Sequence, residues 1–121
     1  MKIIGYIRTS TKKQKTSINT QKYLIENYCK DLQYCDPILF VDEGKSGWDS
    51  YLKRNSLITA LNTLEENDLF VVKNIERLSR KYEDINIIKE IIHNKKAKLI
   101  ETHPDNLDNL INYLKRFVGI I

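Results

Sequence analysis

The chain has 121 residues, 41% of them hydrophobic, and a formal net charge of +4. This length suits one compact domain with a single core, and so much apolar sequence excludes a mainly disordered chain. The apolar stretch in residues 1–7 is far too short for a signal peptide or a membrane span, so we expect a soluble, cytoplasmic protein. Cys29 and Cys35 lack a second cysteine pair or nearby histidines, which argues against a zinc site or disulfide scaffold and favours two small, partly buried apolar side chains.

The first half of the chain predicts two strands separated by a helix. Residues 2–7 form a short apolar run without helical period, as in a buried strand. From Ser17, whose hydroxyl suits an N-cap, apolar residues recur every three or four positions as far as Leu32, which predicts one face of a helix. A second strand is expected over residues 38–41, and a polar loop over residues 42–54.

The second half repeats this alternation. Asn55 or Ser56 is expected to cap the next helix. The later helices are expected within residues 57–64, 85–92 and 107–117, and the later strands within residues 69–73 and 98–101. Parallel neighbouring strands need a crossover, and a helix supplies it. We therefore expect an α/β fold with a mostly parallel, four- to five-stranded sheet and helices on both faces.

The functional crevice of such a sheet lies beyond the carboxyl ends of its strands. The segments expected there are residues 8–16, 42–54 and 74–81. The basic residues in or beside them are Lys12, Lys13, Lys15, Lys45, Lys53, Arg54, Lys73, Arg77, Arg80 and Lys81. A basic rim is therefore predicted, which permits contact with nucleic acid without requiring it. His93 and His103 are expected on a helix and a turn away from this end, which leaves the rim without histidine or metal ligands.

Ser10 follows the first predicted strand, with Arg8 two residues before it. Serine hydroxyls are common in turns, so Ser10 by itself suggests only a structural role. Arg77 and Arg80 would share a face if their turn begins a helix, and Arg54 ends the neighbouring loop. An alcohol nucleophile beside several fixed cations suits phosphoryl transfer, because preorganised donors must stabilise the charge on the phosphate oxygens. Arginine suits this role because its planar fork matches phosphate geometry.

The same residues also admit a simpler explanation. Asp42 and Glu76 carry carboxylates in the same segments as the arginines of the rim. These carboxylates would form a surface set of salt bridges with Arg77 and Arg80. Local spacing alone leaves both interpretations open.

A longer pattern of residues bears on this choice. Its members, in chain order, are Tyr6, Arg8, Ser10, Gln14, Ser17, Gln21, Asp42, Ser46, Gly47, Arg54, Glu76, Arg77, Leu78, Ser79 and Arg80. In order and spacing they resemble the N-terminal catalytic domain of the resolvase/invertase serine recombinases. The similarity runs from Ile3 to about Ile100, in register with the predicted elements. A single Y-x-R-x-S motif is weak evidence, whereas the ordered set of blocks is specific.

The resemblance implies a resolvase-like fold and a mechanism for site-specific DNA recombination. Ser10 would attack the scissile phosphate and leave a 5′-phosphoserine and a free 3′-hydroxyl, without metal or cofactor. The residues implied to grip the phosphate are Arg8, Arg54, Arg77 and Arg80. Gln21 and Asp42 would order the site, and Lys12, Lys13, Lys45 and Lys73 are expected to contact DNA phosphates. The implied partners are DNA, a second copy in a homodimer, and a tetramer during strand exchange.

Two departures from the family pattern leave alternatives open. The resemblance also implies a catalytic role for Glu76, but Glu76 stands where the family usually has aspartate, so the carboxylate reaches one methylene further. Family members also continue through a long dimer helix into a DNA-binding region. On this basis we expect residues 1–121 to form a catalytic domain without the DNA-binding domain, with residues 105–121 as a shortened start of the dimer helix. Two sets of residues resemble the large recombinases of phages and mobile elements: Ser17, Ile18 and Gln21, and Gly44, Ser46 and Gly47.

Two other functions fit parts of the pattern. The chain could be a truncated, non-cleaving relative that acts as a dimerisation or regulatory module. It could also be an α/β module for a phosphorylated small ligand, although it lacks the glycine-rich phosphate loop expected after the first strand.

Overall fold

The computed structural model describes residues 1–11 and 15–103, in which four strands alternate with three α-helices. The elements are β1 (Ile3–Arg8), α1 (Lys15–Asp31), β2 (Ile38–Asp42), α2 (Asn55–Thr63), β3 (Leu69–Val72), α3 (Tyr82–Asn94) and β4 (Lys98–Glu101). Two short 3₁₀ turns, η1 (Tyr51–Lys53) and η2 (Ile75–Arg77), precede α2 and α3. The helix expected over residues 107–117 lies outside the described residues. No helix in the described part is long and apolar enough to cross a membrane.

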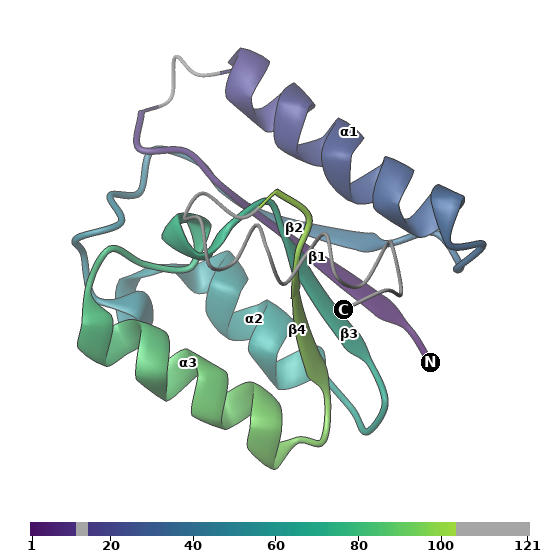
Figure 1. Ribbon diagram of the computed structural model, residues 1–121. Coiled ribbons are helices and arrows are strands. Elements are labelled where there is room, and N and C mark those ends of the chain that lie inside the picture. Colours follow the sequence, from purple (N-terminus) through teal and green to yellow (C-terminus); the bar gives the residue numbers. More distant parts are fainter. Residues whose placement is uncertain (12–14, 104–121) are drawn as a thin grey trace, which may run out of the picture.

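All described strands run parallel, in the order β2-β1-β3-β4. The central strand β1 is buried along its whole length. Its register pairs Arg8 with Asp42, so the carboxyl ends of β1 and β2 lie side by side. Helices α2 and α3 cover one face of the sheet and α1 covers the other (Figure 1). The expected α/β fold is confirmed.

Alternate residues of the strands face two separate clusters of apolar side chains. Ile4, Tyr6 and their neighbours pack against α2 and α3, whereas Ile3 and Ile7 pack against α1. Cys29 belongs to the second cluster, and burial raises the pKa of its thiol to about 11. Cys35 is exposed, so the expectation of a partly buried side chain is wrong for it.

The starts of two helices differ from the sequence-based expectations. Helix α1 begins at Lys15, which places Ser17 inside the first turn instead of at the N-cap. Helix α2 has Arg54 at its N-cap position, and the side chain of Arg54 makes no capping bond. The capping acceptor for α2 comes from a residue on β2, as described below. Local residue types could not reveal this, because the carboxylate comes from outside the helix.

The opposite end of the sheet is held by the buried carboxylate of Asp68. It accepts hydrogen bonds from the Lys2 backbone amide at 2.9 Å, the Lys2 ammonium at 2.5 Å and the Glu65 amide at 2.8 Å. Burial alone would raise the pKa of Asp68, but the bonds from Lys2 and Glu65 outweigh it and lower the pKa. The folded state therefore favours the ionised carboxylate.

We expect Asp68→Asn to reduce the free energy of unfolding by roughly 1–3 kcal/mol at neutral pH. Because the pKa of Asp68 is lower in the folded state, its contribution is present above the unfolded pKa of about 4 and is lost as pH falls through the folded value. Urea unfolding of the variant and wild type at neutral pH and near pH 3 measures the difference. Glu66→Gln, which removes an exposed ion pair, is the control. A deficit of equal size at both pH values would contradict the prediction.

Candidate active site

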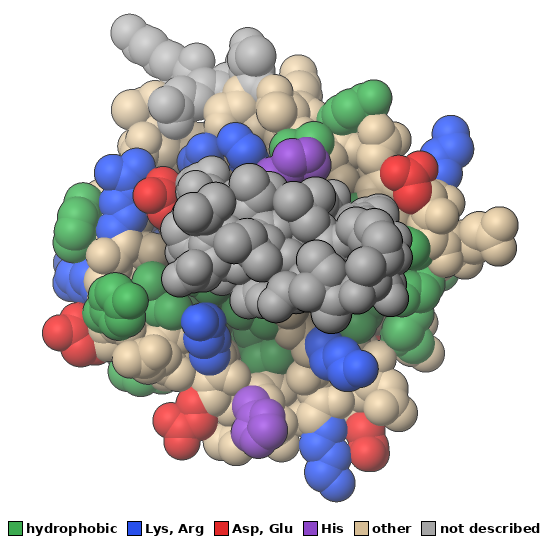
Figure 2. Space-filling model, in the orientation of Figure 1, with side chains coloured by type: hydrophobic (Ala, Val, Ile, Leu, Met, Phe, Trp, Pro, Cys, Tyr) green, Lys and Arg blue, Asp and Glu red, His purple; other side chains and the backbone are tan. Residues whose placement is uncertain are grey.

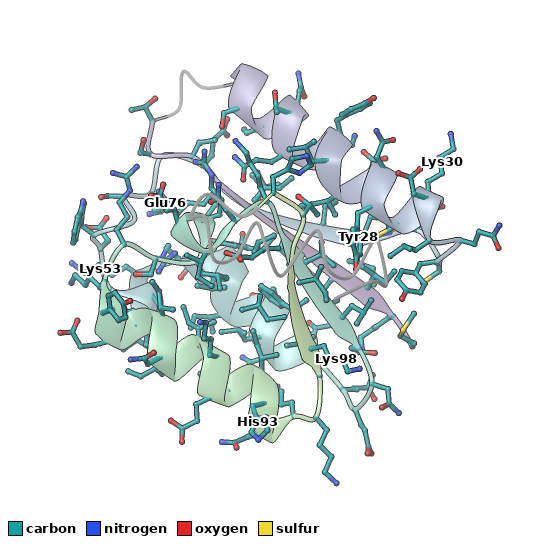
Figure 3. The ribbon with its side chains drawn as sticks, viewed as in Figure 1. Tyr28, Lys30, Lys53, Glu76, His93 and Lys98 are labelled. Atoms are coloured by element: carbon teal, nitrogen blue, oxygen red, sulfur yellow. The ribbon has the colours of Figure 1, made fainter. Side chains whose placement is uncertain are left out.

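The candidate site lies at the carboxyl end of the sheet, where β1 and β2 meet the loop before α2 and the η2 turn. Glu76 lies at this end, whereas His93 and Lys98 lie at the opposite end (Figure 3). His103 follows β4, and its amide donates to the Lys73 carbonyl at 2.7 Å. The expectation that His103 lies away from this end is therefore wrong.

The guanidinium group of Arg8 is the centre of the site. Its side chain is only 1% exposed, and it donates to three backbone carbonyls from two segments. The acceptors are Lys45 at 3.0 Å, Glu76 at 2.7 Å and Arg77 at 3.2 Å. Arg8 thus joins the loop after β2 to the η2 turn, and the expected phosphate contact would need this guanidinium to rearrange or to use its remaining N–H groups.

Three further guanidinium groups, of Arg54, Arg77 and Arg80, lie close enough to Arg8 to act on its charge. Burial, aided by the positive charges of Arg54, Arg77 and Arg80, lowers the pKa of Arg8 to about 10, so that it is still a cation at neutral pH. Arg77 donates from Nη1 to the Arg8 carbonyl at 3.2 Å. The predicted convergence of arginines is observed, although η2 is a single turn and does not continue into a helix carrying both Arg77 and Arg80.

These arginines differ in their access to solvent. Arg54 is fully buried and donates from Nη1 to the Leu78 carbonyl. Among the described residues, the Arg54 Nε and Nη2 atoms and the Arg77 Nε atom are buried without a partner. The Arg80 side chain is exposed, and Arg77 is half-buried. Arg77 and Arg80 are therefore the two that an outside phosphate reaches most directly.

Asp42 ties β2 to the start of α2. Its Oδ2 atom accepts from the Tyr6 hydroxyl at 2.8 Å and the Leu57 amide at 3.0 Å, and its Oδ1 atom accepts from the Ser56 amide at 3.0 Å. Asp42 therefore caps the first turn of α2. Burial strongly raises the pKa of Tyr6, so its hydroxyl stays protonated and donates.

No salt bridge within the described part of the chain joins Asp42 or Glu76 to an arginine. The ion pairs found there link Lys2 to Glu65 and Asp68, and Lys96 to Glu66. The surface salt-bridge explanation is therefore wrong. Glu76 is exposed and contributes to the site through its carbonyl oxygen, which accepts from Arg8.

Ser10 is exposed immediately after a rigid strand end. The preceding residue, Thr9, is bonded through its amide to the Asp42 carbonyl at 3.1 Å and through its carbonyl to the Lys45 amide at 2.9 Å. Gln21 on α1 accepts from the Arg8 amide at 3.3 Å and donates to the Arg8 carbonyl at 3.0 Å. These bonds place the Ser10 backbone beside the arginines, two residues beyond the carbonyl that Arg77 contacts.

Two of the four lysines that are expected to contact DNA phosphates lie within the described residues. Lys12 and Lys13 lie outside the described residues. Lys45 and Lys73 are half-buried, and their carbonyls accept hydrogen bonds from Arg8 and His103. On the face shown in Figure 2, lysine and arginine side chains are interspersed with acidic and apolar ones. No three His, Cys, Asp or Glu side chains of the described residues form a group that could hold a metal ion.

Gly47 was part of the sequence pattern without an assigned role, and the structure shows what it does. A Cβ atom there would lie 2.8 Å from the Arg80 Cγ and 2.9 Å from the Arg8 Nη2. The Gly47 carbonyl also accepts from the Arg80 amide at 2.8 Å and the Ser79 hydroxyl at 3.2 Å. Gly47 therefore allows the loop backbone to lie directly on the arginine cluster.

We expect Gly47→Ala to reduce the free energy of unfolding by about 1–3 kcal/mol, because the added methyl group must displace the anchored guanidinium of Arg8. Urea denaturation measures the change. Ser46→Ala in the same loop is the control, with an expected effect within about 0.5 kcal/mol. Equal stability of the Gly47→Ala variant and wild type would show that the loop adjusts without moving Arg8.

Known proteins share both the sequence pattern and the fold. The family model described as the N-terminal domain of resolvase matches residues 3–120. None of the curated proteins matches the chain. The N-terminal catalytic domain of TP901-1 integrase is 21% identical, with a TM-score of 0.73 over 98% of this chain and 99% of that one. The C-terminal catalytic domain of ISC1926 TnpA, an IS607-like serine recombinase, is 19% identical, with a TM-score of 0.73 over 98% and 84%.

A serine recombinase from Sulfolobus solfataricus shares the fold as well. It is 23% identical, with a TM-score of 0.65 over 98% of this chain and 80% of that one. At these identities the structures establish the fold, and the family model establishes the relationship along nearly the whole sequence. The chain therefore belongs to the resolvase family of serine recombinases and corresponds to its N-terminal domain.

Proposed function

We propose that this chain cleaves and rejoins DNA in site-specific recombination, with Ser10 as the nucleophile. The observation that carries the proposal is the position of Ser10, which is exposed at the end of β1 beside a cluster of four arginines. The Ser10 Oγ atom bonds to phosphorus and loses its proton as the bond from phosphorus to the 3′ oxygen breaks. The 3′ oxygen leaves as a hydroxyl. The 5′-phosphoserine retains a phosphodiester, so attack by a 3′-hydroxyl reverses the step without an energy cofactor.

The accessibility of the arginines suggests a division of roles. Arg77 and Arg80 bind the non-bridging phosphate oxygens, where paired N–H donors stabilise the transition state. Arg8 and Arg54 hold the surrounding backbone through carbonyl bonds and add positive charge. The other proposed contributors are Gln21 and Asp42, which order the site, and Lys12, Lys13, Lys45 and Lys73, which contact neighbouring phosphates. Two copies would cut as a dimer, and a tetramer would exchange strands.

A nicked duplex that carries the cognate recombination site tests the proposal. The nick lets a short strand diffuse away after cleavage, so the protein stays covalently attached to DNA. We expect a denaturation-resistant adduct whose DNA-linked peptide contains Ser10, detected by gel mobility and mass spectrometry. An adduct at any other residue would refute the assignment of Ser10.

A second candidate is a regulatory or dimerisation module that does not cleave DNA. It is favoured by one observation: the Arg8 and Arg54 guanidinium groups are buried and already donate to backbone carbonyls. The same duplex distinguishes the two candidates. Binding of the duplex, or self-association, without any covalent adduct would support the regulatory module.

A further inference from the structure

The η2 turn carries three groups of the candidate site but has weak local support. It presents the Arg77 side chain and the two carbonyls, of Glu76 and Arg77, that accept from Arg8. Within the turn, the amides of Arg77 and Leu78 bond to the Asn74 and Ile75 carbonyls. The side chain of Asn74 at the N-cap makes no capping bond. A single 3₁₀ turn has poor hydrogen-bond geometry and needs outside contacts to hold its position.

One such contact comes from β4, the edge strand that pairs with β3. The Glu101 Oε1 atom accepts a hydrogen bond of 2.6 Å from the Ile75 amide, the first amide of the turn. Glu101 is the last residue of β4 and is paired in register with Val72. The next amide, of Thr102, bonds to the Val72 carbonyl at 2.9 Å. The backbone that carries Glu101 is therefore anchored to β3, which leads directly into η2.

We propose that Glu101 is a positioning residue for the proposed cleavage site, which it serves by fixing the η2 turn. Its carboxylate gives the first amide of the turn an acceptor from outside the turn, and a charge-assisted bond of this kind is stronger than a neutral one. The η2 turn then holds the Arg77 guanidinium in hydrogen-bond contact with the Arg8 carbonyl. Glu101 thus acts on the arginines proposed to bind phosphate from the neighbouring edge strand, although it belongs to none of the catalytic groups proposed above.

The surroundings of Glu101 make this role separable from folding. Glu101 and Ile75 line an open pocket of about 570 Å³ between α3 and β4, and Glu101 is not part of either apolar cluster. Removing its carboxylate leaves the apolar core intact. The loss is therefore expected at the turn and not throughout the domain.

Three variants test the proposal, which rests on the proposed function of the site. Glu101→Leu removes the acceptor, Glu101→Gln keeps an acceptor oxygen on a side chain of equal length, and Glu90→Leu removes an exposed carboxylate from α3. In Glu101→Leu we expect adduct formation at saturating nicked duplex to slow by on the order of ten- to a hundredfold, with little change in DNA affinity. In Glu101→Gln the rate of adduct formation should stay within about threefold of wild type, because the amide oxygen still accepts the hydrogen bond, although it is neutral. The rate of adduct formation by Glu90→Leu should equal that of wild type.

Amide hydrogen exchange separates the failure of this inference from the failure of the proposed function. Ile75 should lose protection in Glu101→Leu and keep most of it in Glu101→Gln, while Phe70 and Val71 in β3 stay protected in both. If wild type forms no adduct but Ile75 responds in this way, the anchoring of the turn stands and the cleavage function fails. Unchanged protection of Ile75 in Glu101→Leu, or equal losses in Glu101→Leu and Glu101→Gln, would overturn the inference.

Discussion

Replacing Ser10 with alanine should abolish the covalent protein–DNA adduct while leaving the fold intact. The substitution removes the only atom proposed to bond to phosphorus, and no other group of the site is placed in that role. Ser10 is exposed beyond the end of β1, so removing its hydroxyl creates no cavity in the core. The free energy of unfolding should therefore change by less than about 0.5 kcal/mol.

Adduct yield on the nicked duplex and urea denaturation together measure these two expectations. Ser56→Ala is the matched control, since Ser56 contributes its amide, not its side chain, to the bond with Asp42. The Ser10→Ala protein should still bind the duplex, with affinity that falls steeply as salt rises, because phosphate contacts remain. Adduct formation by Ser10→Ala at the wild-type rate would exclude Ser10 as the nucleophile.

Arg8→Lys should reduce both stability and activity, although it conserves charge. The Arg8 guanidinium donates to carbonyls from two separate segments, and a lysine ammonium is a single donor centre that cannot match this fork. At least one of these carbonyls would lose its partner. We expect the free energy of unfolding to fall by about 2–4 kcal/mol and the rate of adduct formation to fall by roughly a hundredfold or more.

Arg80→Lys provides the contrast. The Arg80 side chain is exposed, so its replacement should change the free energy of unfolding by less than about 0.5 kcal/mol. Its rate of adduct formation should nevertheless fall by on the order of tenfold or more, because lysine cannot make the bidentate phosphate contact proposed for Arg80. Urea denaturation and adduct kinetics on both variants separate the two roles. If Arg8→Lys were as stable as wild type, the three carbonyl bonds would not organise the site.

Much of the architecture could be predicted from short-range patterns. The periodicity of apolar residues indicated the strands and helices of the described part in their correct order, because burial of one face imposes a period on each element. The position of Ser10 after β1 followed from the same pattern. The helix starts at Ser17 and Asn55 were less well predicted, because capping depends on an acceptor that need not be local.

The composition of the candidate site also followed in part from the sequence. The arginines were correctly expected at the carboxyl end of the sheet, where parallel strands bring separate loops together. The role of Gly47 was not foreseen, although its place in the ordered pattern was a signal. Tyr6 also belonged to that pattern, and its bond to Asp42 needed the pairing of β1 with β2 to become visible.

By itself, the sequence determined the alternation of elements, the family relationship and the place of Ser10 after the first strand, since each depends on local periodicity or on an ordered motif. Only the tertiary structure decided what the arginines and carboxylates do. Arg8 and Arg54 point into the protein and bind carbonyls, and Asp42 caps a helix instead of pairing with an arginine. These bonds join residues 14 to 69 positions apart. Their geometry arises when the strands pair and the loops pack, and residue spacing along the chain does not encode it.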